Sequence, residues 1–136
     1  MTKPIISLED LHLTLTSRAG PVHILRGVTL DVPAGQSIAI VGPSGSGKTS
    51  LLMILGGLER ASSGKVEVAG RSMSGLAEDE LSGLRGAEIG IVFQSFHLVP
   101  TMTALENVAL PMELARIEGA FDNARRLLHD VGLCAR

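Results

Sequence analysis

The segment Gly-Pro-Ser-Gly-Ser-Gly-Lys-Thr at residues 42–49 restricts fold and chemistry more than any other part of this chain. It fits the pattern G-x-x-x-x-G-K-[ST] at every constrained position. One apolar run, residues 38–41, precedes it, and another, residues 51–55, follows it. A strand, a glycine-rich loop and a helix in that order form a phosphate-binding loop. The sequence therefore predicts an α/β protein that holds a phosphate group at residues 42–49.

The residue types of this loop suit a triphosphate and a divalent cation. Its glycines carry no Cβ, so successive backbone N–H groups can point inward, and the following helix adds free N–H groups and the positive end of its dipole. Lys48 would supply a charge to the β- and γ-phosphates, and the Thr49 hydroxyl would hold Mg²⁺. A Gly/Ser-rich turn that only starts a helix needs neither Lys48 nor Thr49. The expected nucleotide-binding residues are Gly42, Pro43, Ser44, Gly45, Ser46, Gly47, Lys48, Thr49 and Ser50.

Composition excludes several other classes of function. The formal net charge of −2 argues against a general nucleic-acid partner, and the chain has no Trp, no Tyr and three Phe residues, too few for a row of base-stacking aromatics. Cys134 is the single cysteine, so no internal disulfide is possible, which suits the cytosol. No apolar run approaches the roughly 18 residues of a membrane span. We expect a protein that reaches a membrane only through a partner.

The strands predicted from the sequence form two groups. Residues 5–15 and 22–32 predict two early strands, which suggests a small, partly antiparallel layer. Residues 65–69 alternate and end at Gly70-Arg71, which indicates a further strand at the edge of a hairpin. Two short and continuously apolar runs, residues 38–41 and 89–93, predict strands buried on both faces. The chain should therefore combine an antiparallel sheet with a buried core around the loop.

The predicted helices have clear sequence signals at their ends. Thr103 and Glu106 have the spacing of a capping box, and Pro111 should interrupt or kink the helix that follows. Gly56 and Gly132 are typical of helix C-termini. Four helices are expected, from about residue 48 to 56, over 74–85, from about 104, and over 121–131.

Four further segments resemble the ATP-binding subunits of ABC transporters, and most closely the lipoprotein-release and macrolide-export branch. They are residues 28–36, 55–66, 89–94 and 98–108. The resemblance covers essentially the whole chain. It implies an α/β fold of the P-loop NTPase type, specifically an ABC ATPase core with an antiparallel β subdomain over about residues 1–96. The start of a helical subdomain would occupy about residues 97–136.

The resemblance also implies roles for single residues. Residues 42–49 match the Walker A motif, which binds ATP with Mg²⁺, and Gln94 matches the Q-loop glutamine, which contacts Mg²⁺ and the attacking water. A neutral amide offers both a donor and an acceptor for this task, although the residues alone allow a solvent-facing strand end. Leu15 stands where many relatives place an aromatic that stacks on adenine. Leucine packs against a base without a π-stack, which leaves the preference for ATP open.

The resemblance further implies partners and a location. Phe96, His97 and Leu98 match the stretch that approaches the coupling helix of a transmembrane permease subunit. Without the resemblance, Phe96 and Leu98 are equally consistent with core packing and His97 with an ordinary surface position. A second ATP-binding subunit would complete a homodimer in the full-length protein. The protein would lie in the cytoplasm, peripheral on the inner face of the cell membrane, and would couple ATP hydrolysis to transport.

Several family features are missing from the sequence. Three features that the family carries do not follow Gln94: a Leu-Ser-Gly-Gly-Gln signature, a Walker B strand with its catalytic Glu, and a switch histidine. Residues 81–85 begin like the signature, but they precede Gln94 and match it only by chance. We therefore expect the truncated N-terminal part of a longer ATPase. Alone, it should bind Mg-nucleotide weakly, lack meaningful turnover and have marginal stability, because strands 38–41 and 89–93 would lack neighbours.

The residues allow two alternatives to a transporter ATPase. Another phosphate-loop enzyme, such as a GTPase or a kinase, should carry an Asn-Lys-x-Asp segment or an arginine-rich lid, and Arg125-Arg126 is too little for a lid. A non-catalytic module that binds a nucleotide or a partner is the second alternative, and the residues leave it open.

Overall fold

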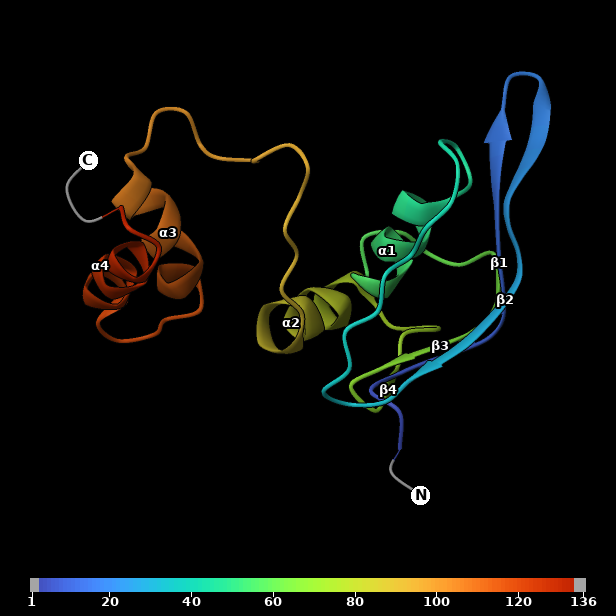
Figure 1. Cartoon of the computed structure of the whole chain (residues 1–136), viewed down its shortest axis with the longest axis horizontal. Helices are drawn as coiled ribbons and strands as arrows, with labels where there is room; N and C mark the ends of the chain where they lie inside the picture. The colour runs from blue at the N-terminus through green and yellow to red at the C-terminus, as the bar shows by residue number, and fades with distance from the viewer. Residues whose placement is uncertain (1–2, 134–136) are drawn as a thin grey trace. The chain divides into compact units, whose positions relative to one another are not determined.

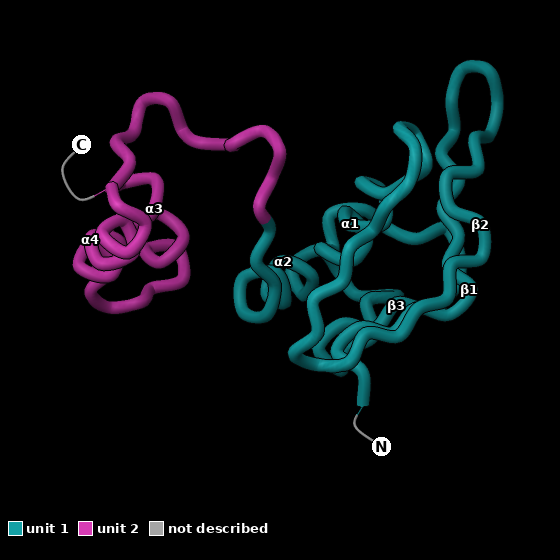
Figure 2. The backbone as a smooth tube through the Cα atoms, in the orientation of Figure 1, with its two compact units in different colours: residues 1–91 teal, residues 92–136 magenta. Residues whose placement is uncertain are grey.

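The computed structural model of this protein describes residues 3–133, so Cys134 lies outside the described residues. The chain divides into two compact units, residues 1–91 and residues 92–136, called unit 1 and unit 2 in Figure 2. Unit 1 contains the sheet and two helices, and unit 2 contains two helices. The subdomain division expected near residue 96 stays a prediction.

Unit 1 is built on a four-stranded antiparallel sheet with the strand order β2-β1-β3-β4 (Figure 1). Its strands are β1 (Ile6–Ser17), β2 (Gly20–Val32), β3 (Ser63–Val68) and β4 (Arg71–Ser72). The long β1–β2 hairpin closes with Ser17 opposite Gly20. The predicted antiparallel layer is confirmed, with strand ends that differ by a few residues.

A bulge in the centre of β1 shapes this sheet. Asp10 has a φ of 47°, and the register slips at this point against both neighbouring strands. The Asp10 N–H donates to the Thr29 hydroxyl at 3.1 Å instead of to a carbonyl of the ladder. On the other side, Gly64 of β3 passes directly over the Asp10 carbonyl. The bulge bends β1 and increases its local twist.

Helix α1 (Lys48–Leu55) packs on the apolar face of the sheet, and α2 (Glu78–Glu88) packs beside α1. The core consists of buried aliphatic residues and one methionine: Leu8, Leu11, Leu13, Leu25, Leu51, Ile54, Leu55, Val66, Val68, Met73, Leu81 and Leu84. Arg85 joins the two helices, since its guanidinium donates to the Gly57 carbonyl at 2.6 Å and to Glu78 at 2.8 Å. This contact places a cation at the negative end of the α1 dipole.

The expected helix over residues 74–85 begins later than predicted. Residues 74–75 form a turn after β4, and α2 starts at Glu78. The Glu80 carboxylate accepts the Ala77 N–H at 2.8 Å, which satisfies one free amide at this helix start. The signature-like residues 81–85 lie on α2 with Leu81 and Leu84 buried, so their apolar spacing reflects helix packing.

The two predicted buried strands, residues 38–41 and 89–93, are absent from the sheet, and this prediction was wrong. Ile40 and Ile89 pack against the core of unit 1, but neither segment has a hydrogen-bonded strand beside it in the described residues. Val41 is 86% exposed and Val92 is fully exposed. An apolar run indicates a tendency to be buried, whereas a strand also needs a neighbour that completes its backbone hydrogen bonds.

Unit 2 contains α3 (Ala104–Leu114) packed against α4 (Ala120–Asp130). The predicted capping box is confirmed, because Thr103 Oγ1 accepts the Glu106 N–H at 3.2 Å and Glu106 accepts the Thr103 N–H at 2.7 Å. Pro111 lies inside α3 and does not interrupt it. The proline removes one i→i−4 hydrogen bond, and the helix continues for only three residues beyond it.

Candidate nucleotide-binding site

The loop over residues 42–49 leads directly into α1, as the sequence predicts. Gly47 is the N-cap residue with φ 88° and ψ 7°, a left-handed conformation that favours glycine. A Cβ at Gly47 would lie 3.1 Å from the Ile24 carbonyl oxygen and 3.0 Å from Leu25 Cδ2. The loop is therefore seated against β2, and the absence of a side chain at Gly47 permits this close approach.

Most backbone N–H groups of the loop have no acceptor. Within the described residues, Ser46 donates to the Pro43 carbonyl at 3.3 Å, and the first intrahelical bond of α1 is donated by Leu51 to Gly47 at 2.9 Å. The amides at 44, 45, 47, 48 and 49 have no acceptor within residues 3–133. Free N–H groups at a helix N-terminus favour a bound anion.

Lys48 lies over this loop. Its ammonium Nζ donates to the Gly42 carbonyl at 2.9 Å and to the Pro43 carbonyl at 2.7 Å, and it lies 3.4 Å from the Ser46 hydroxyl. Within residues 3–133, no carboxylate forms an ion pair with it. The positive charge is thus held at the loop by neutral carbonyls and is available to a negatively charged ligand.

The loop borders a cleft of about 320 Å³. Its lining residues are Ile24, Ser44, Gly45, Gly47, Lys48, Thr49 and Ser50. The Thr49 side chain is exposed and lines this cleft. Because hydroxyl oxygen is a ligand that Mg²⁺ accepts alongside phosphate oxygens, Thr49 fits the predicted metal role.

Sequence reasoning missed one lining residue of this cleft, Ile24 of β2. Ile24 packs partly against the core of unit 1, and its Cγ2 and carbonyl oxygen lie beside Gly47 together with Leu25 Cδ2. The register between β1 and β2 shifts at this point, so the alternation of β2 does not give the direction of the Ile24 side chain. The contact with the loop depends on tertiary packing, which the sequence pattern does not give.

Leu15, the other predicted nucleotide contact, lies near the tip of the β1–β2 hairpin opposite Val22. It is 42% exposed and does not line the cleft beside the loop. An exposed apolar side chain there is available to pack against a flat apolar group. Its role in base binding stays a prediction.

Gln94 belongs to unit 2 and its side chain is exposed. Its predicted role beside Mg²⁺ stays a prediction. Nearby, Phe96 is 85% exposed and Leu98 is 63% exposed, which contradicts the alternative that these two residues pack in a core. The His97 ring packs edge to face with Phe93 at a centroid distance of 4.6 Å.

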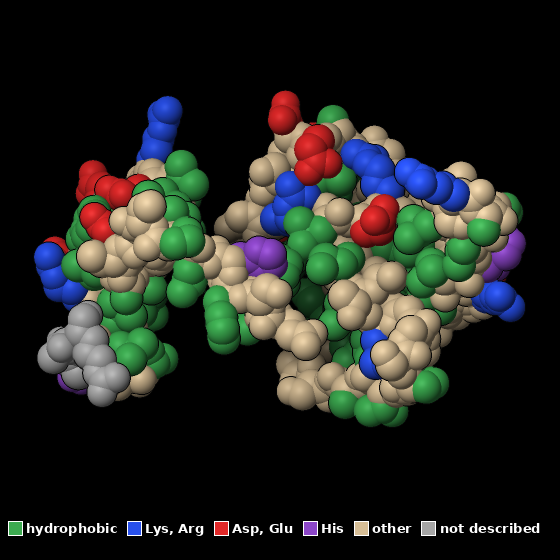
Figure 3. Space-filling model, turned by 90° about the horizontal axis from the view of Figure 1, so that it is seen from above, with side chains coloured by type: hydrophobic (Ala, Val, Ile, Leu, Met, Phe, Trp, Pro, Cys, Tyr) green, Lys and Arg blue, Asp and Glu red, His purple; other side chains and the backbone are tan. Residues whose placement is uncertain are grey.

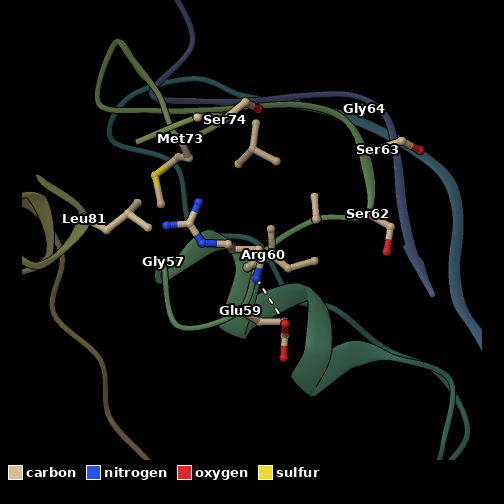
Figure 4. Close-up of a pocket in the computed structure, with 13 residues that line it drawn as sticks. Gly57, Glu59, Arg60, Ser62, Ser63, Gly64, Met73, Ser74 and Leu81 are labelled. Atoms are coloured by element: carbon tan, nitrogen blue, oxygen red, sulfur yellow. Dashed lines mark hydrogen bonds between the residues drawn. The ribbon is translucent and has the colours of Figure 1, made fainter. Parts of the chain in front are cut away.

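A second hollow in unit 1, of about 250 Å³, lies away from the loop (Figure 4). It is lined by Ile54, by the segment 57–64 and by residues near Met73 and Leu81. Arg60 is its main cationic group and donates to the Leu76 carbonyl at 2.8 Å, while its backbone N–H donates to the Glu59 carboxylate at 3.1 Å. Within the described residues, most backbone N–H groups of segment 57–62 donate to protein acceptors, unlike those of the loop over residues 42–49.

The sequence model of the ABC transporter family matches residues 25–135. This match contains the loop, the cleft residues 44–50 and both segments that precede and follow Gln94. The chain belongs to the ABC transporter family. This result excludes a GTPase or a small-molecule kinase as the family of this chain.

Two curated members of the family illustrate the similarity. The pyoverdine export ATP-binding/permease protein PvdT of Pseudomonas fluorescens (strain Pf0-1) is 45% identical over all of this chain and 21% of its own length. The lipoprotein-releasing system ATP-binding protein LolD 2 of Caulobacter vibrioides (strain ATCC 19089) is 43% identical over 98% of this chain and 59% of its own length. The chain thus spans between about a fifth and three fifths of the relatives that it matches.

A solved family structure confirms the predicted fold class. The dimeric post-hydrolysis state of the ATP-binding cassette MJ0796 bound to ADP and Pi matches with a TM-score of 0.84 and 34% identity. The match covers 91% of this chain and 56% of that cassette. The α/β P-loop architecture with an antiparallel sheet and helices, covering part of such a cassette, is therefore the fold of this chain.

No helix among residues 3–133 has the length and apolar character needed to cross a bilayer. In the same part of the chain, no three His, Cys, Asp or Glu side chains gather where they could hold a metal ion.

Proposed function

We propose that this chain binds Mg-ATP at residues 42–50 and forms part of the ATP-binding subunit of an ABC transporter. The geometry of the loop is the observation that carries the proposal. Free backbone amides, the Lys48 ammonium and the N-terminus of α1 all lie at one open cleft. A helix N-terminus with such a loop favours a phosphate chain.

The described residues would divide the chemistry of ATP between them. The loop amides and Lys48 neutralise charge on the β- and γ-phosphates, and they act best in a site that excludes water. Thr49 would hold Mg²⁺, which neutralises further charge on the phosphates. Gln94 is proposed to orient the attacking water, because its amide can both donate and accept. Ile24 would cover one wall of the cleft with apolar surface.

The proposed partners are a transmembrane permease subunit and a second ATP-binding subunit. The names of relatives such as the ATP-binding/permease protein PvdT support the first, and the dimeric state of MJ0796 supports the second. The exposed side chains of Phe96 and Leu98, with His97 between them, form the proposed permease contact. Through that contact the subunit would sit on the cytoplasmic face of the cell membrane.

We further propose that ATP hydrolysis coupled to transport belongs to the complete subunit. The 136-residue chain carries Walker A and the Q-loop glutamine without a signature peptide or a Walker B carboxylate. We therefore expect it to bind Mg-ATP and to release no phosphate above the background rate. Turnover by the purified chain would contradict this part of the proposal.

Calorimetric titration of the chain with Mg-ATP tests the binding site. Lys48→Ala removes the cation at the loop and should weaken binding by roughly tenfold to hundredfold, the value of one charged hydrogen bond. Lys65→Ala is the matched control, because Lys65 lies on β3 and pairs with Glu9 at 2.6 Å, away from the cleft. Equal affinity of the wild type and Lys48→Ala would overturn the proposed function.

A further inference from the structure

Asn107 makes an unusual set of hydrogen bonds in unit 2. Its Oδ1 accepts the Val99 N–H at 2.8 Å, and its Nδ2 donates to the carbonyls of Val99 at 3.2 Å, Met102 at 3.1 Å and Thr103 at 3.0 Å. Asn107 is the fourth residue of α3, a helical position that asparagine does not favour on its own. One side chain thus binds several backbone groups of the loop that precedes the helix.

The loop before α3 is also fixed by contacts that do not involve Asn107. The Met102 N–H donates to the Val99 carbonyl at 3.1 Å, which closes a turn inside the loop. At its start, His97 has a φ of 49° and packs against the Phe93 ring. The segment over residues 93–103 therefore has defined contacts at both ends, although it contains no helix or strand.

The segment between these contacts exposes apolar side chains. Phe96 is 85% exposed, Leu98 is 63% exposed and Met102 is 38% exposed. Phe96 and Leu98 lie mostly in water and gain little from a fixed position, so the burial of these two side chains does not order the loop. The hydrogen bonds of the loop backbone to the Asn107 side chain, together with the turn between Val99 and Met102, hold it instead.

We propose that Asn107 is a positioning residue that fixes loop 98–103 and so presents Leu98 and Met102, next to Phe96, as an ordered apolar surface. An ordered loop loses less conformational entropy when a partner binds than a mobile one does. The use of this surface by a membrane partner rests on the proposed function. The ordering of the loop by Asn107 does not depend on it.

The test is amide hydrogen exchange and methyl relaxation by NMR on the 136-residue chain. In Asn107→Ala, the Val99 amide should exchange at least tenfold faster and the Met102 methyl should become more mobile, while α3 amides beyond residue 108 keep their protection. Asn107→Asp keeps an acceptor for the Val99 N–H and loses the two amide protons that the carbonyls of Val99, Met102 and Thr103 share, so it should restore part of the Val99 protection and leave Met102 mobile. This partial rescue separates a positioning role from a general loss of folding.

Asn123→Ala is the matched control. Asn123 is the fourth residue of α4, and its side chain accepts a hydrogen bond from the Arg126 guanidinium of the same helix at 3.4 Å. This variant has the same change in helix propensity and should leave Val99 and Met102 unaltered.

Three results would overturn the inference. They are a Val99 amide that is unprotected in the wild type, equal Val99 exchange in the wild type and Asn107→Ala, and an equal effect of Asn123→Ala. If Asn107→Ala does not fold, Val99 exchange in the wild type and in Asn107→Asp still shows whether the Asn107 side chain orders the loop. The experiment uses no nucleotide and no partner. A chain that failed to bind Mg-ATP and still showed the Asn107 effect would refute the proposed function and leave this inference standing.

Discussion

Gly64 passes so close to the bulge in β1 that a side chain has no room. A Cβ there would overlap the Asp10 carbonyl oxygen and lie 2.7 Å from Leu11 Cα, and its φ is 93°. Gly64→Ala should therefore lower the free energy of unfolding of unit 1 by about 2–3 kcal/mol, through the clash and the left-handed backbone. Urea denaturation followed by circular dichroism measures this change.

Gly83 provides the matched control for that substitution. It lies in α2 with nothing within 4 Å of an added Cβ. Gly83→Ala should raise stability by up to about 1 kcal/mol, because alanine favours the helix. A Gly64→Ala variant as stable as the wild type would show that the bulge relaxes freely.

At the residue scale, the sequence predicts the loop because its chemistry depends on covalent spacing. Gly47, Lys48 and Thr49 follow one another, so their roles follow from a local pattern. Ile24 could not be predicted, since its contact with the loop depends on how β2 packs beside it. The same reason applies to Gly64, whose need for glycine arises from a bulge on a strand more than fifty residues earlier.

At the scale of a single element, the start of α3 links stability to pH. The Thr103 backbone N–H first, and then its hydroxyl, hold the pKa of Glu106 below its ordinary value. The folded-state pKa lies below the unfolded one, so the contribution to stability is present above the unfolded pKa. It is lost as the pH falls through the folded-state pKa.

Thr103→Ala should raise the pKa of Glu106 part of the way to its ordinary value. The variant removes the hydroxyl donor and keeps the backbone N–H, which is the larger cause of the shift. Carbon-detected NMR titration of the Glu106 carboxyl group follows this change directly. An unchanged titration midpoint would mean that the bond donated by the Thr103 hydroxyl does not stabilise the Glu106 carboxylate.

The elements differ in how well the sequence predicts them. The α3 start is predicted correctly because Thr103 and Glu106 satisfy each other within four residues. The segments 38–41 and 89–93 are wrongly predicted as strands, since a strand is completed by a neighbour that the segment itself does not specify. The start of α3 could be predicted because residues of the helix end itself determine it, whereas a strand depends on a distant partner.

At the scale of the whole molecule, both units expose hydrophobic side chains, which are green in Figure 3. In unit 1, Ile38 is 48% exposed and Val41 is 86% exposed, and no strand pairs with their segment in the described residues. Exposed apolar groups beside unpaired backbone favour association between molecules. We therefore expect the isolated chain to associate on heating, so that its thermal melt is not sharp, cooperative and two-state.

The double variant Ile38→Thr/Val41→Thr should reduce that association. It should change the free energy of unfolding by no more than about 0.5 kcal/mol per site, because both side chains are exposed. Leu84→Ala is the contrasting control, since Leu84 is buried and its loss should cost about 2–5 kcal/mol. Light scattering during a thermal ramp measures association. Equal scattering by the wild type and the double variant would exclude residues 38–41 as the associating surface.

Amide chemical-shift mapping with Mg-ATP shows whether residues 42–50 hold the phosphates of ATP. We expect saturable shifts that are largest at the free amides of residues 44–49, with a smaller shift at Ile24. Unmoved loop amides, or largest shifts around the Arg60 hollow, would contradict phosphate binding at this loop.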